Sequence, residues 1–231
     1  MNTTRCSVDS IVKLNDYVYQ VKLTPASTVE YRPGQYAKLV LSEDDKRIFS
    51  IASHPSAEQI ELHIGAAEGD EYPLQAIAHL QANPQVIMEI GEGDAFLREQ
   101  QQRPRLLIAG GTGFSYVHSI LTHMLEHGNN PPTEVIWGCR SEVDMYYFEQ
   151  VKAWADANDW LSFTPVLENA VENTQATQGL LLDVVKALHP NLAEYDVYLA
   201  GRFEMAAAAK AQFVEQQVDL KHLYGDAFGY V

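Results

Sequence analysis

The sequence predicts two domains, an N-terminal antiparallel β-barrel followed by an α/β domain built on a doubly wound parallel sheet. In residues 5–90, apolar and polar residues alternate in short segments separated by proline and glycine. After Pro104 the pattern changes to continuous apolar strands, each followed by apolar residues at helical spacing. Between the two patterns, residues 99–104 are polar and end in a proline. We therefore expect domains at residues 1–100 and 104–231.

The barrel half contains four segments with a period of two, which places alternate side chains on opposite faces of a strand. These expected strands are residues 17–23, 36–41, 60–64 and 86–90. One helix is expected among them, over residues 73–81. Short strands separated by turn residues are typical of a small antiparallel barrel.

The second half alternates buried strands with helices, which is the pattern of a parallel sheet with crossover helices. The expected strands are residues 105–109, 134–137, 161–166 and 196–200. The expected helices are residues 116–127, 147–158, 180–188 and 204–216.

Composition limits the class of partner. The 231 residues include 31 acidic and 16 basic side chains, a formal net charge of -15, which repels nucleic acid and anionic lipid. The apolar runs are too short to cross a bilayer, so no membrane partner is expected. With only Cys6 and Cys139, and no signal-peptide pattern at the N-terminus, we expect a cytoplasmic protein without a metal site.

A glycine-rich turn connects the first expected strand of the second half to its helix. It consists of Gly110, Gly111, Thr112, Gly113, Phe114 and Ser115. Such a turn lets backbone amides and the positive end of a helix hold a pyrophosphate. Tyr116 stands where the dinucleotide fingerprint has its third glycine. The alternative is a tight corner without a ligand.

Two further turns follow strands of the same sheet. After residues 134–137, Arg140 stands where dinucleotide folds often carry an acidic residue for the ribose, so it is a candidate for a 2′-phosphate; Glu142 weakens this inference, and an arginine in solvent is the alternative. After residues 196–200, a second strand-to-helix turn contains Gly201, Arg202 and Met205.

In the barrel half, Arg47 and Ser50 flank Ile48 and Phe49 and bring a cation and a hydroxyl within three residues. In an extended strand these two side chains face opposite ways, so one ligand touches both only if the chain bends there. A surface arginine and a capping serine are the alternative.

Four motifs, taken in order, resemble the ferredoxin–NADP reductase superfamily, and the whole chain looks closest to its Fre-type bacterial NAD(P)H-flavin reductases. The motifs are residues 32–36, 47–50, 110–113 and 201–205. The resemblance implies an enzyme that transfers hydride from NADH or NADPH to N5 of a flavin held by the barrel, in a cleft between the domains. It implies a flavin site of Tyr36, Arg47, Ile48, Phe49, Ser50, His63, Ile64, Gly65, Ala66 and Phe228, with Ser50 catalytic beside N5. It implies a nucleotide site of Gly110, Gly111, Thr112, Gly113, Phe114, Ser115, Arg140, Gly201, Arg202 and Met205.

Two departures from the superfamily refine this expectation. Residues 68–73 carry carboxylates where relatives grip the FAD pyrophosphate, so we expect riboflavin, FMN or FAD to be an exchangeable substrate. Ala200 stands where several relatives place a cysteine beside the nicotinamide. Reduced flavin would then pass to acceptors such as a flavin-dependent monooxygenase. The alternatives are a reductase that keeps its flavin and reduces a protein or a ferric or cobalamin acceptor, and a non-catalytic nucleotide-binding module.

Overall fold

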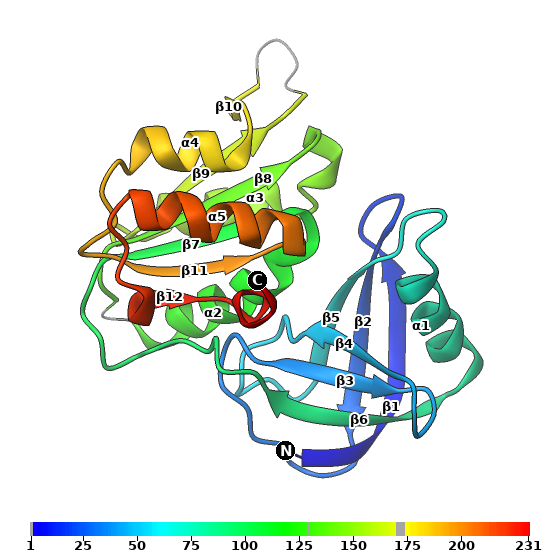
Figure 1. Cartoon of the computed structure of the whole chain (residues 1–231). Helices are drawn as coiled ribbons and strands as arrows, with labels where there is room; N and C mark the ends of the chain where they lie inside the picture. Colours follow the sequence, from blue (N-terminus) through cyan, green and yellow to red (C-terminus); the bar gives the residue numbers. More distant parts are fainter. Residues whose placement is uncertain (1, 129, 170–173) are drawn as a thin grey trace. The chain divides into compact units, whose positions relative to one another are not determined.

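The computed structural model describes residues 2–128, 130–169 and 174–231 (Figure 1). The chain divides into two compact units. The barrel unit contains Met1–Leu97 and His118–Glu126, and the parallel-sheet unit contains Arg98–Val117 and His127–Val231. The sequence predicts a single boundary near residues 99–104, whereas residues 118–126, part of an expected helix, group with the barrel unit.

The barrel unit is a six-stranded antiparallel sheet in the order β4-β3-β6-β1-β2-β5. A bridge between Ile51 and Leu62 joins the end of β4 to β5 and nearly closes the sheet, as the expected barrel requires. The elements are β1 (Asn2–Lys13), β2 (Val18–Pro25), β3 (Tyr36–Val40), β4 (Lys46–Ser50), β5 (Ile60–Gly65), α1 (Glu71–Ala82) and β6 (Gln85–Glu92).

Two of these strands, β1 and β4, were not among the strands expected from apolar alternation. In β1 the inward positions include Thr4 and Cys6, which are buried, so the inward face is not marked by large apolar residues. β1 pairs with both β2 and β6, and these tertiary pairings define a strand that a local pattern does not.

Helix α2 (Phe114–His127) supplies the barrel unit's second segment. The His118 ring nitrogen Nδ1 lies 2.8 Å from the carbonyl oxygen of Ala52. The Ser119 hydroxyl donates to the carbonyl oxygen of Ser53 at 2.7 Å. These two hydrogen bonds involve the segment that follows β4, and they explain why residues 118–126 group with the barrel.

The parallel-sheet unit has the strand order β10-β9-β8-β7-β11-β12. Every adjacent pair is parallel, which confirms the expected doubly wound sheet. Helices α4 and α5 cover one face, while α3 lies on the other (Figure 1). The remaining elements are β7 (Arg105–Gly110), β8 (Thr133–Cys139), α3 (Phe148–Ala157), β9 (Leu161–Leu167), β10 (Thr177–Gln178), α4 (Leu181–Leu188), β11 (Asp196–Ala200), α5 (Phe203–Glu215) and β12 (Leu223–Tyr224).

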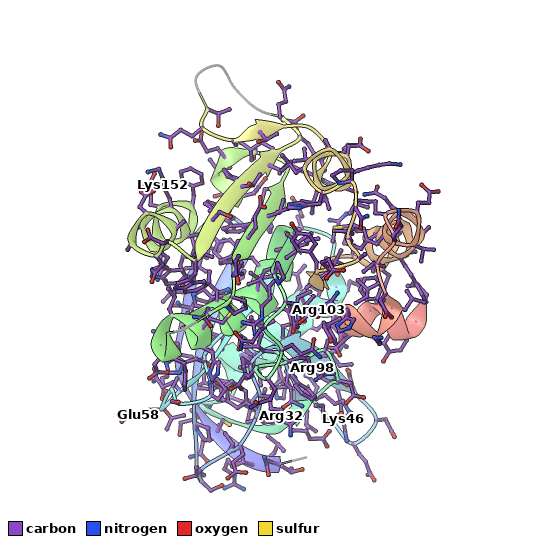
Figure 2. The ribbon with its side chains drawn as sticks, turned by 90° about the vertical axis from the view of Figure 1, so that its left-hand side faces the viewer. Arg32, Lys46, Glu58, Arg98, Arg103 and Lys152 are labelled. Atoms are coloured by element: carbon purple, nitrogen blue, oxygen red, sulfur yellow. The ribbon has the colours of Figure 1, made fainter. Side chains whose placement is uncertain are left out.

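The polar segment before β7 is fixed to this sheet by charge. Arg103, labelled in Figure 2, pairs through Nε with the buried carboxylate of Asp196 at 3.3 Å. His222 Nδ1 lies 2.7 Å from the same carboxylate. A buried carboxylate with two such partners avoids the desolvation cost of an isolated charge. Among the described residues, no helix combines the length and the apolar character needed to span a membrane.

Candidate functional site

β7 lies between β8 and β11. After β7 the chain adds β8, β9 and β10 on one side of it, and then β11 and β12 on the other side, so β7 is the switch point of the strand order. The strands are parallel, so the residues that follow β7, β8 and β11 meet at one edge of the sheet. A crevice at the carboxyl edge beside such a switch point is where doubly wound sheets bind ligands. The structure therefore brings together the predicted glycine turn, Arg140 and the turn at Gly201.

The glycine turn forms a 3₁₀ turn at Gly111–Gly113 that leads directly into α2. Gly111 has a φ of 53°, in the left-handed region that favours glycine, and an added Cβ would meet no atom within 4 Å. The Trp137 indole N–H donates to the Gly111 carbonyl oxygen at 3.0 Å. The Trp137 ring also stacks on Phe114, with ring centroids 3.9 Å apart. The buried pair of Trp137 and Phe114 thus fixes one side of the turn, while the Cα of Gly111 faces open space on the other side.

Cys139 also contacts the turn, at the end of β8. Burial and the charge of Asp144 raise the pKa of the Cys139 thiol, although a hydrogen bond with the Gly111 backbone opposes this shift. The thiol therefore stays protonated near neutral pH, and reactive cysteines need the thiolate form. Cys139 is a packing residue of the turn.

The two strand-to-helix turns are in close contact. The Met205 sulfur lies against Gly110 and Gly201, and a Cβ built on Gly110 would stand 2.6 Å from it. A Cβ on Gly113 would overlap the carbonyl oxygen of Ala200. Gly113 is therefore required by packing against the backbone at the end of β11, whereas at Gly110 and Gly201 the atoms in the way belong to the flexible Met205 side chain.

Two predicted cationic residues at this edge are exposed. Arg140 follows β8 and Arg202 precedes α5. Next to Arg140, the Ser141 hydroxyl and backbone N–H both donate to the Asp144 carboxylate, at 2.8 and 3.0 Å. Ser141 is thereby committed to its own turn, which leaves Arg140 as the exposed cation at the end of β8.

In the barrel unit, the predicted motif of residues 47–50 lies on β4, which pairs with β3 in unbroken register from Lys46 to Ser50. The chain does not bend between Arg47 and Ser50, so their side chains lie on opposite faces of the strand. A single planar ligand reaches both only by lying across the strand edge. Tyr36 of β3 is the cross-strand partner of Ser50.

The Arg47 guanidinium already has partners in the protein. Its Nε and Nη2 donate to Asp45 at 2.6 and 2.8 Å, and Nη2 also donates to Gln75 at 2.7 Å. The Arg47 guanidinium lowers the pKa of Asp45. It also stands over the ring of Tyr72, 4.5 Å from the centroid. In the sequence, Tyr72 lies within the acidic stretch of residues 68–73, and no local pattern predicts its contact with Arg47.

The predicted residues of β5 are mostly in the core. The His63 side chain has no exposed surface, and Ile64 and Ala66 are also buried. Gly65 is partly exposed. Phe228 belongs to the parallel-sheet unit, where it lies beside Gly225 and packs against that unit's core. Within the barrel unit, the predicted flavin residues that keep exposed surface are therefore Tyr36, Gly65 and the four on β4.

Glu61 and His63 of β5 form a polar network with His118 of α2, in which both histidines are buried. His63 Nε2 is 2.8 Å from a carboxylate oxygen of Glu61, and the ring centroids of His63 and His118 are 5.3 Å apart. Burial raises the pKa of Glu61, but hydrogen bonds from His63 and Gln20 and the histidine charges outweigh it and lower that pKa to about 2. Burial, with the nearby His63, lowers the pKa of His118 to about 4.

This network predicts that the barrel unit loses stability as the pH falls. The folded state depresses the pKa of His118 from 6.5, so its neutral form contributes stability that is lost from pH 6.5 down to about 4. The expected loss is about 3 kcal/mol. Urea unfolding at pH 7.0, 5.5 and 4.0 measures it, and His118→Gln should have a flatter pH dependence than the unsubstituted protein. Equal slopes for the two proteins would contradict the assignment to His118.

A shallow groove of about 570 Å³ lies elsewhere on the barrel unit, lined by Thr28, Val29, Glu30, Tyr31, Arg32, Gln35 and Pro55. None of the predicted flavin residues lines it. Among the described residues, no group of three or more His, Cys, Asp or Glu side chains forms a metal site.

Known proteins of similar sequence identify the family of this chain, and solved structures share its fold. Residues 107–211 match the oxidoreductase NAD-binding domain. The chain is 40% identical to an NAD(P)H-flavin reductase of Vibrio harveyi, over 99% of this chain and all of that protein. It is also 40% identical to an NAD(P)H-flavin reductase of Aliivibrio fischeri, over 98% of each chain.

Solved structures share the two-domain fold. A ferredoxin NADP+ reductase of Neisseria gonorrhoeae matches with a TM-score of 0.76 and 15% identity, over 94% of this chain and 92% of that one. A cytochrome P450 reductase of Amycolatopsis matches with a TM-score of 0.85 and 22% identity, over 97% of this chain and 69% of that one. The chain is 40% identical to two NAD(P)H-flavin reductases over nearly its whole length, and it carries the glycine turn and the β4 motif. It therefore belongs to the family of NAD(P)H-flavin reductases.

Proposed function

We propose that this protein transfers hydride from NADH or NADPH to a flavin that binds and leaves as a substrate. One observation carries the proposal, namely that the likeness to NAD(P)H-flavin reductases extends over nearly the whole chain. It therefore includes both the residues expected to bind the nucleotide and those expected to bind the flavin. Hydride transfer needs chiefly the alignment of two reactive rings, which the protein supplies by binding each of them.

The nucleotide binds at the carboxyl edge of the parallel sheet. Its pyrophosphate accepts hydrogen bonds from the amides of the glycine turn at Gly110–Ser115, at the positive end of α2. Arg140 is exposed at the neighbouring strand end, where it can pair with a 2′-phosphate and admit NADPH. The turn at Gly201, Arg202 and Met205 completes the same edge.

The flavin binds on β4, where Ile48 and Ser50 are at least partly exposed. Within the described chain, no group of the protein hydrogen-bonds the Ser50 hydroxyl, which can therefore donate to a ligand. A hydroxyl beside N5 orients the ring and stabilises charge that develops there during hydride transfer. Ser50 is the catalytic residue of this proposal.

The segment between β5 and α1 favours an exchangeable flavin. Glu68, Asp70 and Glu71 are all exposed there. Three carboxylates repel a diphosphate brought beside them, so the protein gains little from binding the FAD pyrophosphate. Reduced flavin leaves the protein in the cytoplasm and is available to acceptors such as a flavin-dependent monooxygenase.

The experiment is an assay of the desalted protein. Oxidation of NADH and of NADPH is followed at 340 nm with and without added riboflavin, after the visible spectrum has been recorded. We expect a colourless protein whose activity requires added flavin. A yellow protein that reduces artificial acceptors alone would support a bound-flavin reductase, and no oxidation under any condition would support a non-catalytic nucleotide-binding module.

A further inference from the structure

The Tyr72 side chain on α1 lies against the outer edge of β4. The Ile48 backbone N–H donates to the Tyr72 phenol oxygen at 2.7 Å. β4 is the last strand in the sheet order, so on this side it has no neighbouring strand hydrogen-bonded along Lys46–Ser50 within the described chain. In an antiparallel strand the N–H groups alternate, and the Ser50 N–H is directed to the same edge as that of Ile48.

Three contacts hold Tyr72 in this position. Its ring centroid lies 6.2 Å from that of Phe49, in a tilted arrangement. The Arg47 guanidinium stands over the Tyr72 ring, 4.5 Å from its centroid, and Arg47 Nη1 donates to the Tyr72 carbonyl oxygen at 3.4 Å. Tyr72 therefore contacts Arg47, Ile48 and Phe49, which are three of the residues assigned to flavin.

The position of Tyr72 conflicts with direct binding of a flavin at this edge. Arg47 and Ser50 lie on opposite faces of β4, so a planar ring reaches both only by crossing the edge that Tyr72 covers. The flavin ring carries carbonyl oxygens and ring nitrogens that accept hydrogen bonds, and the Ile48 N–H is a donor at that edge. Tyr72 and Ile48 are 43% and 44% exposed as residues, so the phenol can leave without opening the core.

We propose that Tyr72 is a displaceable cap on the flavin site, and that its hydroxyl competes with the flavin for the Ile48 backbone N–H. This inference rests on the proposed function. Each flavin that binds breaks the Tyr72 hydrogen bond, and each that leaves allows it to form again. The cap weakens flavin binding and favours release, as an exchangeable substrate requires.

The test is the dissociation constant of riboflavin, measured by quenching of its fluorescence without nicotinamide nucleotide. Tyr72→Phe keeps the ring and its contacts with Phe49 and Arg47 but removes the hydroxyl. We expect this variant to bind riboflavin about fivefold more tightly, since one net hydrogen bond no longer opposes binding. Tyr195→Phe, the same change in the parallel-sheet unit, is the matched control and should leave the dissociation constant unchanged.

A gain in affinity is a result that damage to the fold would not produce. Equal or weaker riboflavin binding by Tyr72→Phe would overturn the role of Tyr72 while leaving the proposed function intact. If the unsubstituted protein and the variant both fail to bind riboflavin, the proposed function fails, and the cap fails with it. A second measurement is the Ile48 amide signal in a ¹H–¹⁵N spectrum, which should shift when riboflavin is added; an unchanged signal would also overturn the proposal.

Discussion

Gly113→Ala is expected to destabilise the parallel-sheet unit by about 3 kcal/mol and to raise the KM for NADH at least tenfold. The added methyl group would overlap the carbonyl oxygen of Ala200 and come within 2.9 Å of the Gly201 backbone nitrogen. Both obstacles are backbone atoms, so relief requires that the turns after β7 and β11 move apart. These are the two turns to which we assign the nucleotide. Urea unfolding and NADH titration at saturating riboflavin measure the two effects.

Gly229→Ala is the matched control for this substitution. Gly229 lies in the same unit, its φ is outside the positive range, and an added Cβ would meet no atom within 4 Å. We expect its unfolding free energy to stay within about 0.5 kcal/mol of the unsubstituted value. If Gly113→Ala behaves like Gly229→Ala, the two turns are not in the close contact described here.

Ser50→Ala is expected to lower the kcat for riboflavin reduction by roughly tenfold to a hundredfold, with the KM for NADH unchanged. A hydrogen bond to charge that develops at N5 contributes about 1 to 3 kcal/mol, and each 1.36 kcal/mol is a factor of ten in rate. The fold should be unaffected, because within the described chain the hydroxyl makes no hydrogen bond to the protein. Steady-state kinetics with varied NADH and with varied riboflavin separates kcat from the two KM values.

The control for Ser50 is Ser7→Ala, an exposed serine on β1 of the same unit. It should leave all three kinetic parameters unchanged. An unaltered kcat in Ser50→Ala would remove Ser50 from the chemistry and leave β4 as a binding surface only.

The local pattern of the sequence was enough to predict the fold class of each unit, although two strands of the barrel unit, β1 and β4, were not predicted. The four strands and four helices expected after Pro104 all occur, because buried parallel strands and amphipathic helices have a strong and regular apolar pattern. β1 was missed because its inward positions include Thr4 and Cys6, so its pattern is weak and its pairing with β2 and β6 defines it.

The candidate site also has features that the sequence predicts and features that only the tertiary structure shows. The glycine turn was evident from sequence because its chemistry is contained in six consecutive residues. What Gly113 is needed for was not evident, since the atoms that it must avoid belong to Ala200 and Gly201, nearly ninety residues away in the chain.

On β4 the sequence supplied the residues, but only the tertiary structure showed how they are arranged. The motif at residues 47–50 was recognisable, and the alternation of a strand already placed Arg47 and Ser50 on opposite faces. That the strand does not bend, and that Tyr72 covers its edge, depends on the pairing of β4 with β3 and on α1 lying over that edge. The sequence by itself determined the elements and the chemical groups, because these follow from local periodicity and residue type. The tertiary structure decided which groups are buried, which are paired and which remain accessible to a ligand, because those properties depend on contacts between residues distant in the chain.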